Sequence, residues 1–212
     1  MAIALAAVNA LTKRFGDKVR TPVAFSDKVT GRDELSLTVA REVIAEACAL
    51  LKEDPALAFD FLVDISGVDD YEASPRFQVD YLLYSYKTGA LLRLKVGVPE
   101  ENPTVPSVTK VWRGAEWHER ECYDMFGIRF AGHPDLRRIL MWEGYPFHPM
   151  RKDFPLEGRP SNVPEVAFTE AAPLQGGPFV TVPAEHAGER EPRIRENALP
   201  ADMRDKAQKP QP

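Results

Sequence analysis

The chain of 212 residues contains 44% hydrophobic and 28% charged residues and carries a formal net charge of −5. These values are ordinary for a folded domain with its own core, and the negative charge argues against a nucleic-acid-binding protein. Two cysteines are too few for an iron–sulfur cluster, which takes about four, and no run of roughly 18 apolar residues predicts a membrane span.

The first half of the chain predicts an α+β fold. Hydrophobic spacing favours helices over 2–15 and 40–53 and strands over 18–26, 34–39, 59–69, 76–86 and 90–98. Gly89 ends a short link between the last two strands, which predicts a hairpin. We therefore expect a mostly antiparallel mixed sheet flanked by helices, with Cys48 as a small, unreactive core residue. The apolar N-terminus lacks the basic start of a signal peptide, so we expect a protein of the cytoplasmic side.

The second half loses this regularity by stages. A proline-rich loop is expected over 99–107, and a helix over 115–126 that ends at Gly127. After Leu156 the chain contains nine prolines and few apolar residues. We therefore divide it into a domain over 1–156 and an extended tail over 157–212. Apolar residues in the tail, such as Phe168, Leu174, Phe179 and Val180, favour a tail that becomes ordered on a partner; a solvated tail with chance apolar residues is the alternative.

Residues 112–160 contain the candidates for chemistry. Glu121 and Asp124 are three apart on a predicted helix, so they suit an acid/base pair, a solvated face or an ion-pair site for nearby arginines. His118 and Cys122 have the spacing that could begin a zinc site, but no second pair stands at ligand spacing. Nucleotide-binding and hydrolase motifs are absent from the sequence. Metal binding and catalysis therefore have little support.

Charge balance is the other feature of this segment. Between 119 and 159 seven acidic residues alternate with seven basic ones, and the basic ones are six arginines and one lysine. Arginine suits multidentate, partly desolvated contacts, and arginine with aromatic residues is typical of protein interfaces. The arginines could equally pair inside the domain and fix an irregular loop. Both roles are compatible, because a loop fixed by ion pairs is a preorganised docking surface.

Four stretches closely resemble the 30-kDa subunit family of respiratory complex I, which is the C-type subunit of the bacterial enzyme. They are 119–121 (Glu-Arg-Glu), 124–128 (Asp-Met-Phe-Gly-Ile), 132–140 (Gly-His-Pro-Asp-Leu-Arg-Arg-Ile-Leu) and 151–156 (Arg-Lys-Asp-Phe-Pro-Leu). Weaker agreement extends the resemblance over roughly 30–160. One departure is Tyr145-Pro-Phe147, three residues that look inserted before His148. The departure concerns the path of this loop rather than the family.

The resemblance implies a non-catalytic, peripheral-arm subunit of a proton-translocating NADH:quinone oxidoreductase, located on the cytoplasmic side of the bacterial inner membrane. It implies no cofactor in this chain; FMN, iron–sulfur clusters and quinone belong to other subunits. The implied partners are the 49-kDa subunit (the D subunit) and the B and I subunits. The same module occurs in hydrogenases and in complexes fed by ferredoxin, so the electron donor stays open. An independent enzyme using Glu121, Asp124 and His133, and a free-standing binding module, are the other classes.

The motif residues are also the expected subunit interface. In particular, we expect Arg137 and Arg138, with Glu119, Glu121 and Asp124, to lock the irregular segment 127–156 and present it to the quinone-site subunits. The full set of expected interface residues is Glu119, Arg120, Glu121, Asp124, Gly127, His133, Pro134, Asp135, Arg137, Arg138, Arg151, Lys152 and Asp153.

Overall fold

The computed structural model describes residues 2–20, 22–26, 33–142 and 145–155. Its α-helices are α1 (Ala2–Phe15), α2 (Ile44–Glu53) and α3 (Ala115–Phe126), with short 3-10 turns η1 (Gly16–Lys18) and η2 (Arg41–Val43). Its strands are β1 (Val23–Ser26), β2 (Asp33–Thr38), β3 (Phe61–Asp69), β4 (Phe77–Tyr84), β5 (Leu91–Val98), β6 (Thr104–Pro106) and β7 (Arg129–Ala131). The expected tail over 157–212 lies outside the described residues. Among the helices that are described, none is both long and apolar enough to cross a membrane.

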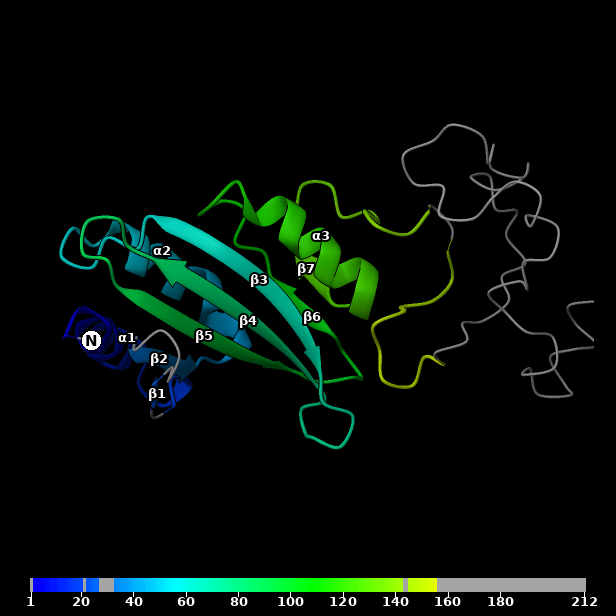
Figure 1. The fold of residues 1–212 in the computed structure, drawn as a ribbon, viewed down its shortest axis with the longest axis horizontal. Coiled ribbons are helices and arrows are strands. Elements are labelled where there is room, and N and C mark those ends of the chain that lie inside the picture. Colours follow the sequence, from blue (N-terminus) through cyan, green and yellow to red (C-terminus); the bar gives the residue numbers. More distant parts are fainter. Residues whose placement is uncertain (1, 21, 27–32, 143–144, 156–212) are drawn as a thin grey trace, which may run out of the picture.

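The main sheet has five strands in the order β1-β2-β5-β4-β3 (Figure 1). Every neighbouring pair is antiparallel except β2 and β5, which run parallel. The hairpin between β4 and β5 turns at Gly89, which has a positive φ of 68°. The predicted α+β class with a mostly antiparallel mixed sheet is therefore confirmed.

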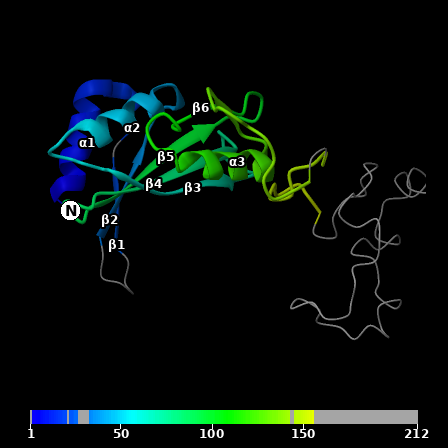
Figure 2. The ribbon, with the colours of Figure 1, turned by 90° about the horizontal axis from the view of Figure 1, so that it is seen from above.

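Alternation along the central strands places the core on one face of the sheet. Phe77, Val79, Tyr81 and Leu83 of β4 are buried, and the residues between them are half-buried. α1 and α2 lie on one side of the sheet (Figure 2), and buried residues of all three helices join the same hydrophobic cluster. Cys48, on the apolar face of α2, is fully buried as predicted.

The helix α3 packs against β3, the edge strand of the sheet. The ring of Phe126 lies so close to Gly67 of β3 that a Cβ atom at that glycine would be 2.5 Å from the ring. On the same side, the thiol of Cys122 donates to the carbonyl of Ile65 at 3.5 Å. Gly67 therefore permits the close approach of helix and strand, which holds α3 in place.

Two short strands were not predicted. Residues 99–107 were expected to form a loop, but β6 pairs there with β7 in a parallel two-stranded sheet. Three residues per strand are too few to show an alternating pattern, and Pro103 and Pro106 hide the first of them. The first strand is also shorter than the predicted 18–26, because only Val19 and then Val23–Ser26 pair.

Candidate functional site

The motif residues meet along helix α3, whose faces have different partners. Residues four apart line up on a helix, so Glu116, Arg120 and Asp124 form one row along it. In the last turn of the helix, the backbone carbonyls of Met125 and Phe126 are available as hydrogen-bond acceptors. This row and this turn contact an irregular segment, described over 133–142 and 145–151 and here called the covering loop.

The covering loop follows α3 from its first turn to its last. At the start, the imidazole Nε2 of His133 lies 3.1 Å from the carbonyl oxygen of Glu116. One turn later the guanidinium of Arg120 donates to the carbonyls of residues 137 (3.1 Å) and 138 (2.9 Å). At the end, the amide of Met150 donates to the carbonyl of Met125 at 3.1 Å. These hydrogen bonds to the helix fix the path of a segment that has no regular secondary structure of its own.

Asp124 is the centre of this arrangement. Its side chain is 0% exposed, and its carboxylate accepts hydrogen bonds from three successive backbone amides, at 3.0 Å (Ile139), 2.7 Å (Leu140) and 2.8 Å (Met141). The guanidinium of Arg138, 14% exposed, forms an ion pair with the same carboxylate. Burial tends to raise the pKa of Asp124, but these donors prevail and hold it below its usual value. The carboxylate is therefore ionised at neutral pH and fully used in binding the loop.

Two side chains from the loop, Arg151 and His148, cap the C-terminal end of α3, which has no basic residue of its own in the last turn. Arg151 Nε donates to the carbonyl of Phe126 at 2.7 Å, and His148 Nδ1 lies 3.0 Å from the carbonyl of Asp124. Positive charge is favourable here because the last carbonyls of a helix are unpaired and carry partial negative charge. Burial lowers the pKa of His148 and of Arg151. His148 is therefore neutral near pH 7 and donates through its Nδ1 proton.

Gly127 makes this capping possible. Its φ is +79°, and a Cβ atom there would lie 2.6 Å from the Arg151 guanidinium and 2.7 Å from the His148 imidazole. A side chain would thus be strained by the backbone and would collide with both capping groups. The sequence predicted a helix end at Gly127, and the structure adds this steric reason.

A second ion-pair cluster fixes the end of the loop to the sheet. Arg76, at the start of β4, binds Asp69 through two hydrogen bonds of 2.8 Å and also pairs with Glu100 and Asp153. The hydrogen bonds to Arg76 lower the pKa of Asp69 and of Asp153, and the amide of Lys152 adds a 2.8 Å bond to Asp69. Asp69, Arg76 and Glu100 were not singled out in the sequence, although Asp69 ends one predicted strand and Arg76 begins the next.

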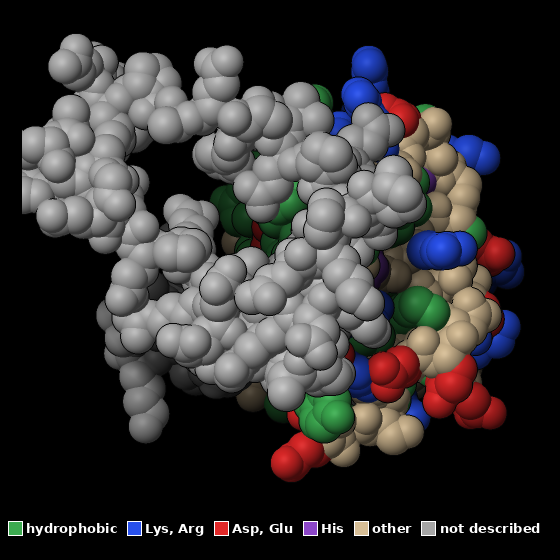
Figure 3. All heavy atoms as spheres, turned by 90° about the vertical axis from the view of Figure 1, so that its right-hand side faces the viewer, with side chains coloured by type: hydrophobic (Ala, Val, Ile, Leu, Met, Phe, Trp, Pro, Cys, Tyr) green, Lys and Arg blue, Asp and Glu red, His purple; other side chains and the backbone are tan. Residues whose placement is uncertain are grey.

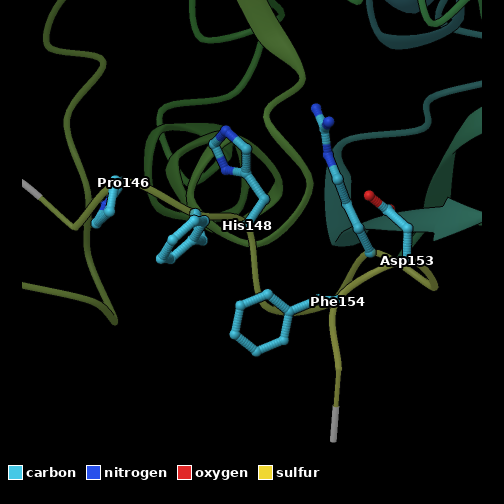
Figure 4. A pocket seen from close by; sticks show the side chains of 6 residues that line it. Pro146, His148, Asp153 and Phe154 are labelled. Atoms are coloured by element: carbon cyan, nitrogen blue, oxygen red, sulfur yellow. The ribbon is translucent and has the colours of Figure 1, made fainter. Parts of the chain in front are cut away.

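A small cavity of about 150 Å³ lies where the loop turns back (Figure 4). Its lining is Pro146, Phe147, His148, Arg151, Asp153 and Phe154. The rings of Phe147 and Phe154 are tilted with centroids 6.0 Å apart. The cavity is about the size of one side chain, and most of its polar lining groups already serve the helix cap or the Arg76 cluster.

Some of the expected lock residues have other roles. Glu119 does not reach the segment 127–156; it accepts hydrogen bonds of 2.7 Å from the Ser107 hydroxyl and the Val108 amide, and so fixes the turn after β6. Burial raises the pKa of Glu119 to about 7. Arg137 pairs with Asp135 in an exposed contact, and only its backbone carbonyl serves the lock. The error arose because sequence spacing does not tell which face of α3 is buried.

The suggested acid/base pair and zinc site do not form. Glu121 is exposed, whereas Asp124 points into the covering loop. His118 pairs with Asp64 at 3.1 Å, whereas the thiol of Cys122 donates to the carbonyl of Ile65. Within the parts of the chain that the structure describes, no three His, Cys, Asp or Glu side chains are grouped to hold a metal ion.

Comparisons with known proteins show the family to which the chain is similar. Residues 37–160 match the family model described as the respiratory-chain NADH dehydrogenase 30 Kd subunit. The second C-type subunit of NADH-quinone oxidoreductase from Rhizobium meliloti is 58% identical over 123 residues, which is 58% of this chain and 67% of that protein. The C/D-type subunit of a Sulfurihydrogenibium species is 41% identical over 157 residues, 74% of this chain and 26% of that protein. The structure of a trypsin-resistant fragment of Nqo5 has a TM-score of 0.51 at 35% identity, covering 63% of this chain and 99% of the fragment.

Proposed function

Because the chain belongs to the 30-kDa subunit family of respiratory-chain NADH dehydrogenase, we propose that it is a non-catalytic, peripheral-arm subunit of a proton-translocating NADH:quinone oxidoreductase. Similar proteins are named as C-type subunits of NADH-quinone oxidoreductase. In this proposal FMN, the iron–sulfur clusters and quinone are held by other subunits, and this chain supports electron transfer by keeping the quinone-site subunits in place. Within the assembled complex, the chain lies peripherally on the cytoplasmic side of the bacterial inner membrane.

One observation carries the non-catalytic role: the buried ionisable groups of the motif at α3, those of Glu119, Arg120 and Asp124, are used in internal contacts. Asp124 and Glu119 are 0% exposed, and Arg120 donates to two backbone carbonyls. A general acid or base must reach the proton that it transfers, so these carboxylates are badly placed for chemistry on a bound molecule. The contacts of Asp124 and Arg120 instead support a role in shaping the covering loop, and those of Glu119 fix the turn after β6, which counts against an independent enzyme.

The outer surface of the covering loop is the proposed interface with the 49-kDa subunit and with the B and I subunits. Pro134, Asp135 and Lys152 are exposed at or beside it, while the backbone beneath is held by α3. A rigid surface loses little conformational entropy on binding, which favours association. The relative named as a C/D-type subunit supports the 49-kDa (D-type) subunit as a direct neighbour, because one chain there combines both names.

The division of the chain is part of the same proposal. Residues 1–156 form the folded unit that carries the loop, and residues 157–212 pack along the partner subunits. The composition of this second part supports the idea, since nine prolines and scattered apolar residues suit an extended chain on a surface.

Affinity purification from membranes tests the proposal. A tagged full-length chain should co-purify with the 49-kDa, B and I subunits and with the subunits that oxidise NADH, and the preparation should reduce quinone with NADH. A complex that lacks the NADH-oxidising subunits but accepts electrons from ferredoxin would show that the electron donor is ferredoxin and not NADH. A chain that purifies alone and shows its own turnover would contradict the proposal.

A further inference from the structure

Trp117 is an exposed tryptophan on the same helix that holds the covering loop, with 59% of its surface accessible. Tryptophan is enriched among the residues that dominate the binding energy of protein interfaces. On the basis of the proposed function, we propose that Trp117 is the anchor side chain through which this chain binds the 49-kDa subunit.

A buried cation packs against the face of the Trp117 indole. The guanidinium carbon of Arg120 lies 5.2 Å from the centroid of the Trp117 ring, within the range of a cation–π contact. Arg120 is itself buried, and its hydrogen bonds to the carbonyls of residues 137 and 138 leave it little freedom. The same arginine therefore fixes the loop and the indole together, and Trp117 loses little side-chain entropy when a partner covers it.

Two charged residues of α3 accompany this aromatic residue. The Arg120 guanidinium lies over the indole, and Glu121, one turn further along the helix, is exposed. Where the surface is visible at the end of the molecule at which α3 ends, acidic and basic side chains are interspersed (Figure 3). An apolar anchor within a polar rim is the usual anatomy of a specific protein interface. The complementary surface is an apolar socket whose rim carries charges of both signs.

Tyr86 is an exposed aromatic residue without this support. It is 66% exposed and stands at the far end of β4, where it packs against the rings of Phe61 and Tyr84. Its backbone amide donates to the carboxylate of Asp60, so its contacts run to β3, β4 and the turn before β3 rather than to α3. Tyr86 therefore provides a control of similar size and exposure.

The 49-kDa subunit is the chosen occupant because the C/D-type relative joins it to a chain like this one.

The test is to co-express the full-length chain with the 49-kDa subunit of the same organism and to measure the concentration at which the pair dissociates. Trp117→Ala should weaken the pair at least roughly tenfold, Trp117→Phe should retain most of the binding, and Tyr86→Ala should change it by less than about twofold. Thermal unfolding of each variant shows whether the fold is intact.

The outcomes separate this inference from the proposed function. Wild-type binding by folded Trp117→Ala, together with weakened binding by Arg138→Ala, would overturn the anchor role and leave the covering loop as the interface. Equal losses from Trp117→Ala and Tyr86→Ala would also overturn it. A wild-type chain that binds the B or I subunits but not the 49-kDa subunit would refute the chosen occupant. Failure to bind any of the three would refute the proposed function itself.

Discussion

Replacing Asp124 by alanine should be among the most damaging single changes to this domain. The change leaves Arg138, 14% exposed, without its carboxylate and leaves three successive loop amides without their acceptor. Breaking a buried ion pair by removing one partner costs about 3–5 kcal/mol. The free energy of unfolding of a whole domain is only about 5–15 kcal/mol. Asp124→Ala should therefore lower the melting temperature by roughly 6–20 °C, at about 2–4 °C per kcal/mol for a chain of this size.

Asp135→Ala is the matched control, because it removes a carboxylate from the same loop. Asp135 is 52% exposed and its partner Arg137 is 70% exposed, so their pair should contribute no more than about 1 kcal/mol. Urea unfolding of both variants, followed by circular dichroism, measures the two free energies. If Asp124→Ala is no less stable than Asp135→Ala, then the buried contacts of Asp124 do not hold the loop and the reasoning fails.

Three further predictions follow from the same region and the core. Gly127→Ala should destabilise the domain by about 1–3 kcal/mol more than Gly89→Ala, since both glycines have positive φ but only Gly127 faces close neighbours; equal losses in urea unfolding would show that the collision is relieved. Glu119 keeps its proton up to a pH of about 7 in the folded state, against a usual pKa of 4.5. The folded state thus binds more protons in this window, and stability should fall by up to roughly 3 kcal/mol as pH rises through it, whereas Glu119→Gln should not show this fall; parallel pH curves would refute the assignment. Burial raises the pKa of both cysteine thiols, so Cys48 and Cys122 should react with a thiol reagent only after denaturation, and rapid labelling of the native chain would contradict this.

The sequence alone predicted the helices and strands that have a long, regular hydrophobic pattern. Helices over 2–15, 40–53 and 115–126 and the hairpin at Gly89 agree with the structure to within a few residues. Their hydrophobic periodicity is set by burial on one face, so it is visible in the sequence itself. The three-residue strands β6 and β7 could not be predicted this way, since their pairing depends on contacts between segments distant in the chain.

The sequence predicted most residues of the candidate site, but not which of them form hydrogen bonds and ion pairs with one another. Asp124 and Arg138 do form the expected ion pair. Neighbouring residues of the same type make different contacts. Arg137 pairs with Asp135 at the solvent-exposed surface, and Glu119 binds the turn after β6. Arg76 fixes the end of the same segment through its ion pair with Asp153, yet it lies far upstream in the sequence. Only the three-dimensional packing shows which of these charges are desolvated, and desolvation decides how much each contact contributes.

Arg138→Ala in the native host tests most directly whether the motif shapes a docking surface and takes no part in catalysis. Two quantities are needed, the amount of assembled complex on a native gel and the rate of quinone reduction per assembled complex. We expect less assembled complex with a near-normal rate per complex, and a much smaller loss for the neighbouring exposed control, Arg137→Ala. Normal assembly with abolished turnover would contradict it.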